Sequence, residues 1–217
     1  AAQVKGGTAV HTYTANAVNT IDFKNRILGD LSIQSSDNDT ITVSYTKSFK
    51  GSDGLDVKAK EQKLDEIVVS EAVSGKTLEV EIKRSDENNN NSSRVDVVLR
   101  VPSRVSIVAS NNAGDVQVVN FSGDLKTKVN IGNMNVSTKI TGEVSWDIAV
   151  NIGDIEAKFD ADSSVDLTAS TNSKNVLSSL PLKGERSSSK SLQGILNEGK
   201  GKVSLTNNLG TIRISLR

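Results

Sequence analysis

Short segments in which hydrophobic and polar residues alternate run through most of the chain. Such alternation is typical of β-strands with one buried face, because successive side chains point to opposite sides of a strand. The sequence therefore predicts an all-β protein. The alternating segments are Leu31–Ile33, Ile41–Tyr45, Leu78–Ile82, Val95–Val97, Val105–Ile107, Val144–Val150, Ile155–Phe159, Val165–Ala169 and Ile212–Leu216.

Three segments depart from this alternation. Leu55–Ile67 is rich in Lys, Glu, Gln and Leu and predicts a short helix, with a strand as the alternative for its last residues. Asp86–Ser93 contains four consecutive asparagines and predicts an exposed hairpin tip or loop. Residues 178–200 form a second polar insertion.

The second half of the chain carries a repeated unit that begins with Asn-x-Gly. Its copies start at Asn112, Asn130, Asn151, Asn172 (a degenerate copy) and Asn208, with separations of 18, 21, 21 and 36 residues. Gly-led turns lie between copies, so about 20 residues hold two strands and two turns. We interpret the Gly and Asn residues as turn residues, because both tolerate a positive φ.

One coil of this length cannot bury its inward side chains, but a stack of coils can. We therefore predict a single-stranded, β-helix-like β-solenoid with coils of about 20 residues. An antiparallel sandwich is the alternative; the recurrence of one tripeptide at the same phase favours the solenoid. We expect one elongated domain over residues 1–217, with less regular strands and the short helix in 1–94 and regular repeats in 95–217. The N-terminal strands and the C-terminal strand bearing Arg213 and Arg217 are expected to cover the two open ends.

The order of motifs over residues 60 to 217 is distinctive. A strand that ends in Leu99-Arg100-Val101-Pro102 is followed by Val105–Ile107 and the first Asn-x-Gly copy, and the chain closes on Gly201–Ile214. In this order and spacing the chain resembles the bacterial putative-adhesin domains of unknown function, which are related to the head-domain adhesin-like proteins. It lacks the Gly-Ile-Asn tripeptide of the latter group. The resemblance implies an exported bacterial β-solenoid with no characterised activity and no catalytic residues to assign.

Composition excludes several classes of function. The 26 basic and 26 acidic residues give a net charge of zero, which argues against binding to nucleic acid or an anionic membrane surface. No hydrophobic run exceeds three residues, so no membrane insertion is expected. Without cysteine and with a single histidine, the chain offers no disulfide, no thiolate nucleophile and no His- or Cys-rich metal site.

Few residues are candidates for catalysis or for metal binding. His11 is the sole imidazole base, and with no Gly-x-Ser-x-Gly motif in the chain we interpret it as a surface or edge-strand histidine. Two short acidic clusters contain Asp37, Asp39, Asp160, Asp162 and Asp166. They provide too few oxygens in any known calcium-loop pattern, so we interpret them as solvated turns. We assign no catalytic, cofactor-binding or metal-binding residue and expect no cofactor.

A carbohydrate-active β-helix enzyme is an alternative, and it predicts a cleft with clustered acids or a cation. The residues expected to point outward from successive coils are Asp115, Lys126, Lys128, Glu156, Lys158 and Asp166. Their signs are mixed, as on an ordinary solvated face. Exposed aromatic residues, which sugar-binding sites often use, are scarce. Trp146, Phe159 and Phe121 are expected in the core, whereas Tyr13, Phe23, Tyr45 and Phe49 are not assigned.

We expect a non-enzymatic bacterial cell-envelope or surface protein, an adhesin whose solenoid face contacts a protein or glycan ligand. The enzyme and an exported regulatory or sensory domain are the alternatives. Export to the periplasm or the cell surface is implied by the resemblance, and the start Ala1-Ala2-Gln3-Val4 fits a chain whose leader has been removed. The sequence does not indicate an oligomeric state.

Overall fold

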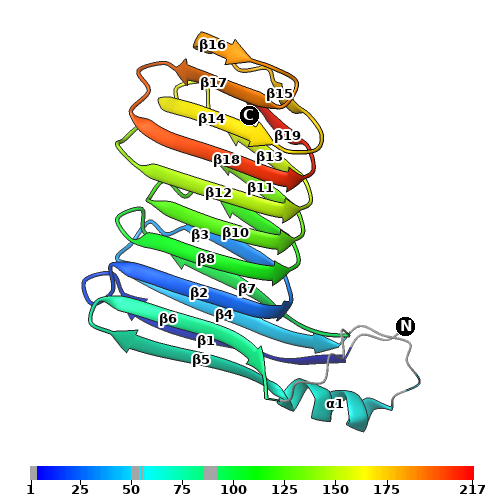
Figure 1. Ribbon diagram of the computed structural model, residues 1–217. Coiled ribbons are helices and arrows are strands. Elements are labelled where there is room, and N and C mark those ends of the chain that lie inside the picture. The colour runs from blue at the N-terminus through cyan, green and yellow to red at the C-terminus, as the bar shows by residue number, and fades with distance from the viewer. Residues whose placement is uncertain (1–3, 50–53, 55, 86–91) are drawn as a thin grey trace.

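Strands from successive coils of the chain stack in two layers, a front and a rear sheet (Figure 1). This computed structural model describes residues 4–49, 54, 56–85 and 92–217. The front sheet contains, in spatial order, β5 (Ile67–Ser74), β6 (Thr77–Arg84), β2 (Thr20–Leu28), β8 (Ser106–Ala113), β10 (Leu125–Ile131), β12 (Ser145–Ile152), β18 (Gly201–Leu209), β14 (Val165–Thr171), β17 (Ser191–Leu196) and β16 (Lys183–Ser187). The rear sheet contains β1 (Val4–Thr14), β4 (Thr40–Phe49), β7 (Ser93–Val101), β3 (Leu31–Ser35), β9 (Val116–Val119), β11 (Met134–Thr138), β13 (Ile155–Phe159), β19 (Ile212–Leu216) and β15 (Val176–Ser178). A pairing of Leu28 with Arg94 joins the two layers.

The repeated part is a parallel β-solenoid, as the sequence predicts. In a coil, a front strand turns a corner and continues as a rear strand, as β8 does into β9, β10 into β11 and β12 into β13. Neighbouring coils pair in parallel and in register, so that Leu125 lies opposite Ile107 on one side and Trp146 on the other. Antiparallel pairs occur toward the two ends of the stack, among β1, β4 and β7, between β5 and β6, and at the β16–β17 hairpin. The antiparallel sandwich is therefore wrong for the repeats.

The last coil of the sequence lies inside the stack. Strand β18 pairs with both β12 and β14, and β19 pairs with both β13 and β15. The polar insertion contributes the β16–β17 hairpin, which extends the front sheet beyond β14. The expectation that the C-terminal strand covers an open end is therefore wrong. Arg213 and Arg217 instead pair with Asp154 and Asp160.

The core lies between the two sheets and consists of in-register rows of apolar side chains. One row contains Ile107, Leu125, Trp146, Val203 and Leu167, each no more than 2% exposed. Each coil contributes only a few such side chains and covers them with the coils on either side. Burial in this fold therefore depends on stacking, as in other repeat proteins.

A single helix precedes β5 in the described residues. Helix α1 (Val57–Asp65) lies within the predicted segment, whose Leu55 is outside the described residues. Its N-cap is Asp56, whose Oδ1 accepts the Ala59 N–H at 2.7 Å. Leu64 is buried, and α1 contacts β1 and β4 at the N-terminal end of the stack (Figure 1). The strand expected at the end of the segment begins at Ile67, and most of the predicted Asp86–Ser93 loop lies outside the described residues.

Candidate functional site

The repeated Asn-x-Gly unit forms the corner at which a front strand turns toward its rear strand. The interpretation of its asparagines as positive-φ residues is wrong. Among the described non-glycine residues, positive φ is found at Asn120 and Asn197, and neither belongs to the unit. The asparagines instead form contacts between coils, as do the glycines and the residues that follow them.

The glycines allow the corners of neighbouring coils to touch. Gly132 and Gly153 have φ angles of 147° and 141°, and a Cβ added to Gly153 would lie 2.0 Å from the carbonyl oxygen of Gly132. A Cβ on Gly132 would lie 2.1 Å from the Gly114 oxygen. Only glycine fits such a close approach of two backbones.

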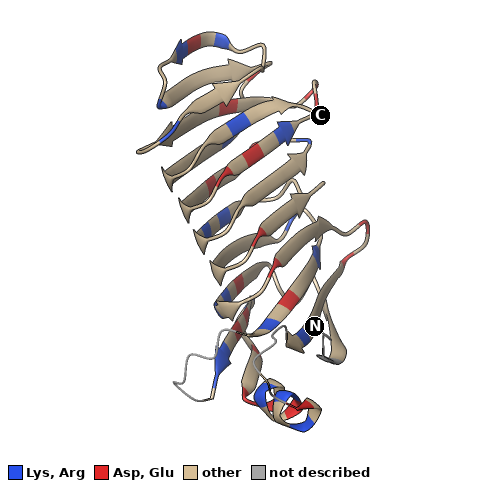
Figure 2. Ribbon diagram, turned by 90° about the vertical axis from the view of Figure 1, so that its right-hand side faces the viewer, with Lys and Arg blue, Asp and Glu red and all other residues tan. Residues whose placement is uncertain are grey.

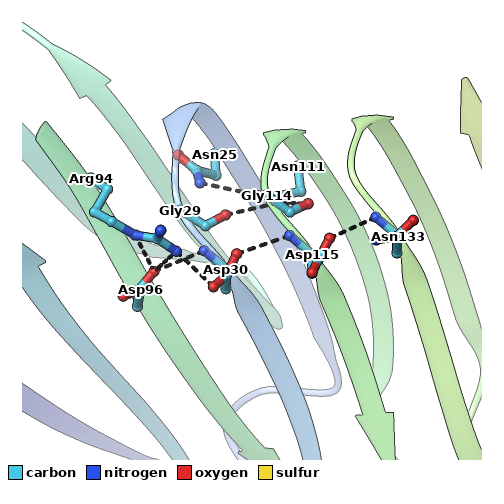
Figure 3. A network of polar contacts seen from close by, with 9 residues as sticks. All are labelled: Asn25, Gly29, Asp30, Arg94, Asp96, Asn111, Gly114, Asp115 and Asn133. Atoms are coloured by element: carbon cyan, nitrogen blue, oxygen red, sulfur yellow. Dashed lines mark hydrogen bonds and ion pairs between the residues drawn. The ribbon is translucent and has the colours of Figure 1, made fainter. Parts of the chain in front are cut away.

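The residue after each glycine forms a second contact, which we call the turn row (Figure 3). The Asp30 Oδ1 accepts the Asp115 N–H at 2.9 Å, and the Asp115 Oδ1 accepts the Asn133 N–H at 2.8 Å. Asn133 accepts from Asp154 at 2.9 Å, and Asp154 accepts from Thr211 at 2.8 Å. Each side chain thus satisfies a backbone N–H of the next coil that the corner would otherwise leave unpaired.

Charge at the two ends of the turn row is balanced locally. Arg94 lies within 2.6 Å of both Asp30 and Asp96, and the Asp96 Oδ1 also accepts the Asp30 N–H (Figure 3). At the other end, the hydrogen bond from the Thr211 backbone, aided by Arg213, lowers the pKa of Asp154. The carboxylates of the turn row accept backbone hydrogen bonds from neighbouring coils, and those at its ends also form ion pairs, so the row has a structural role.

The asparagines form a third contact, the asparagine row. The Nδ2 of Asn130 donates to the Oδ1 of Asn112 at 3.1 Å, and Asn151 donates to Asn130 at 3.0 Å. Asn208 donates to Asn151 at 2.9 Å, and Asn172 to Asn208 at 3.1 Å. Each of the three inner amides uses one N–H and one lone pair in the row, which leaves one donor and one acceptor facing solvent.

A groove of about 810 Å³ runs beside the asparagine row on the front sheet. Its floor is an in-register row of mostly small side chains, Ser110, Lys128, Ala149, Thr206 and Ser170. The small side chains leave the space, and the asparagine row lines the groove along its length. Arg26 and Lys128 also line it, and no acidic residue does so within the described part of the chain.

This groove offers a polar surface with a repeated pattern. One amide per coil presents a donor and an acceptor, and parallel strands repeat this pattern about every 4.8 Å. The sequence identifies the asparagines, but reading it as turns and strands alone misses their groove. The signal was available, because Ser110, Lys128, Ala149, Thr206 and Ser170 each stand two residues before an asparagine and therefore point to the same side of the strand.

The sequence candidates for catalysis lie elsewhere. His11 lies on β1, which pairs only with β4 among the described strands, as expected for an edge-strand histidine. Its Nδ1 contacts the Glu71 carboxylate, and its ring packs edge-on against Tyr45 at 5.8 Å. The hydroxyl of Tyr13 also donates to Glu71, at 3.2 Å. Burial, followed by the charge of Glu71, raises the pKa of both tyrosines.

The acidic clusters are not drawn together into one site. Asp160 pairs with Arg217, Asp162 with Lys139 and Asp39 with Arg104. Within the described ranges, no group of three or more His, Cys, Asp or Glu side chains could hold a metal ion. Nor do these ranges contain a helix of the length and hydrophobicity needed to cross a membrane.

The remaining assignments concern the core and the outward face. Trp146, Phe159 and Phe121 are buried, as predicted, and Phe23 and Phe49 are buried with them. Basic and acidic residues are interspersed over the molecule (Figure 2). Several are neighbours of opposite sign. Examples are Lys126 with Asp147 at 3.9 Å, Lys158 with Glu156 at 2.9 Å and Lys24 with Asp22 at 2.9 Å.

Comparison with known proteins identifies a matching family model and solved structures of similar fold. The family model described as Toastrack DUF4097 matches residues 106–215. No curated protein matches the chain. A crystal structure of a putative cell adhesion protein from Clostridium sporogenes ATCC 15579 shares the fold, with a TM-score of 0.63 and 13% identity over 97% of this chain and 99% of that one. Two further matches have lower TM-scores. A putative adhesin from Bacteroides fragilis NCTC 9343 scores 0.32, at 13% identity over 96% of this chain and 97% of that one. A putative lipid binding protein from Parabacteroides distasonis ATCC 8503 scores 0.28, at 14% identity over 98% and 97%.

Proposed function

The chain belongs to the Toastrack DUF4097 family, and we propose that it is a non-enzymatic bacterial surface protein that binds a glycan chain along the groove beside the asparagine row. Such a protein is an adhesin exported to the periplasm or the cell surface. The description of the Clostridium sporogenes protein of the same fold as a putative cell adhesion protein agrees with this proposal.

The observation that carries the proposal is the set of free amide groups in the groove. The inner amides, those of Asn130, Asn151 and Asn208, each keep one donor and one acceptor after the row is formed. Sugar hydroxyls also donate and accept, so a chain of sugars laid along the stack can pair with one amide after another. The rigid sheet holds these groups in place before binding, which lowers the entropic cost of association.

The groove is less suited to binding a protein or to hydrolysing a glycan. A protein interface usually has a buried centre that is more apolar than the rest of the surface and enriched in Arg. Asn, Ser and Thr make up most of the described lining of the groove, and its Arg26 is already paired with Glu81 at 2.7 Å. The described lining also contains no carboxylate, whereas glycoside hydrolysis usually needs two.

The test is a glycan array probed with the purified chain and with two variants. Asn130→Ala/Asn151→Ala removes two inner amides of the groove. Asn135→Ala removes an amide from β11 on the rear sheet and serves as the matched control. We expect binding to one class of glycan by the wild type and the control, and at least tenfold weaker binding by the double variant.

Thermal melts establish that each variant is folded before its binding is compared. Absence of binding to every glycan, or full binding by the double variant, overturns the proposed function. If the wild type binds a matrix protein on a parallel array and binds no glycan, the ligand is a protein and not a glycan. Recovery of the native protein only from the cytoplasm contradicts the proposed location.

A further inference from the structure

We propose that the groove selects glycans that carry carboxylate groups, and that Lys128 binds such a group. This inference rests on the proposed function and names the chemical class of the glycan. Two lysines point outward from β10. Lys126 and Lys128 are exposed and two residues apart, so they project from the same face of the same strand.

The two lysines have different neighbours. Lys126 lies beside Asp147 of β12, with 3.9 Å between its Nζ and the nearer carboxylate oxygen. Lys128 lies between Ser110 of β8 and Ala149 of β12, which are its register partners and carry no charge. Within the described part of the chain, its ammonium group forms no ion pair. The structure thus places an uncompensated cation in the groove floor, between the first and third of its five residues.

The rest of the groove does not neutralise this charge. Its other cation, Arg26, is paired with Glu81, and none of the described lining residues is acidic. A ligand that lies in the groove therefore meets neutral amide and hydroxyl groups and one free ammonium. Desolvating an ammonium without a partner is unfavourable, so a neutral glycan that covers Lys128 is bound less well than one that offers it an anion.

The positions of the amide and the ammonium suit one sugar residue. Lys128 and Asn130 also project from the same face of β10, two residues apart, so their polar groups are neighbours across the groove. A uronate residue offers hydroxyls to Asn130 and a carboxylate to Lys128. The carboxylate is the group that distinguishes it from the corresponding neutral sugar.

The test compares polygalacturonate with its methyl ester, which has the same backbone and no charge. Affinities are measured by calorimetry for the wild type, Lys128→Gln and the control Lys126→Gln. An exposed ion pair corresponds to a gain of up to about fivefold in affinity. We expect the wild type and Lys126→Gln to prefer the acid by about this factor. Lys128→Gln should bind both polymers equally, and raising the salt concentration should weaken the preference of the wild type.

Three results overturn the inference. The first is an equal loss of preference in both lysine variants, which indicates general attraction to a charged polymer. The second is equal affinity of the wild type for the acid and the ester. The third is no binding by the wild type to polygalacturonate, alginate or hyaluronate. If neutral glycans still bind and Asn130→Ala/Asn151→Ala abolishes that binding, the proposed function stands while this inference fails. If no glycan of any kind binds, both fail.

Discussion

Replacement of Gly153 by alanine tests whether the corners of the solenoid stack with their backbones in contact. The Gly153 φ of 141° is unfavourable for a residue with a Cβ. The added Cβ would lie 2.0 Å from the Gly132 carbonyl oxygen, and this oxygen belongs to the backbone, so it cannot rotate away. The two coils must separate at this corner, or the corner must adopt another conformation.

The cost follows from the contacts that separation breaks. The backbone strain alone corresponds to about 1–3 kcal/mol. Separation also weakens two hydrogen bonds of 2.9 Å, from Gly132 N–H to the Ile152 oxygen and from Met134 N–H to the Asp154 oxygen. At about 1 kcal/mol each, the total loss in unfolding free energy is about 3–5 kcal/mol. For a chain of this length the melting temperature should fall by about 10 °C.

Thermal unfolding followed by circular dichroism measures this effect, with Gly142→Ala as the control. A Cβ added to Gly142 would have no heavy atom within 4 Å, and the φ of Gly142 is not positive, so this variant should melt within about 2 °C of the wild type. A Gly153→Ala variant that melts as high as Gly142→Ala would refute the reasoning. It would mean that the corners have room for a side chain.

Two further predictions concern the buried hydroxyls of two threonines and the carboxylate of Asp154. Thr127 is fully buried with no partner for its Oγ1, whereas the Thr138 Oγ1 donates to the Phe121 oxygen at 2.5 Å. We expect Thr127→Val to raise the unfolding free energy by about 1 kcal/mol and Thr138→Val to lower it by about the same amount, as measured by urea titration. A change of the same sign in both variants would contradict this expectation. Because the folded state lowers the pKa of Asp154, its contribution to stability is present at neutral pH and lost below about pH 4. Asp154→Asn keeps the acceptor for Thr211, so the melting temperature of this variant should fall less than that of the wild type between pH 7 and pH 3. Equal falls in melting temperature would contradict a contribution of the Asp154 carboxylate to stability at neutral pH.

The architecture of one coil was predictable from the sequence because it is local. Alternation places Val116 and Val118 inside, and a glycine two residues before Val116 marks the corner. Both signals lie within a few residues of each other, and the same signals recur in the next coil. The physical role of the asparagines was not predictable in this way. A short polar side chain such as Asn is favoured both in a turn and in a hydrogen bond between coils. Only the register between coils shows which of these two roles an asparagine has.

The groove could be predicted only in part, for a related reason. The alternation shows that Ser110 and Ala149 point outward, but on its own it does not place them on either side of Lys128. That arrangement follows from the register of β8, β10 and β12, which the repeat spacing of 18 and 21 residues sets through the loops between coils. Once the Asn-x-Gly copies are aligned, the floor residues align with them.

The order of the coils depends on information that the repeat does not contain. Corners built from the same unit offer similar groups to a neighbouring coil: a glycine carbonyl, an asparagine amide and a backbone N–H. The asparagine row shows this, since Asn208 bonds to both Asn151 and Asn172 although it is 57 and 36 residues away from them. The β16–β17 hairpin pairs with the outer edge of β14 and leaves its inner edge to β18. The C-terminal coil therefore enters the stack between two earlier coils, and the groove becomes continuous only when this last coil is in place.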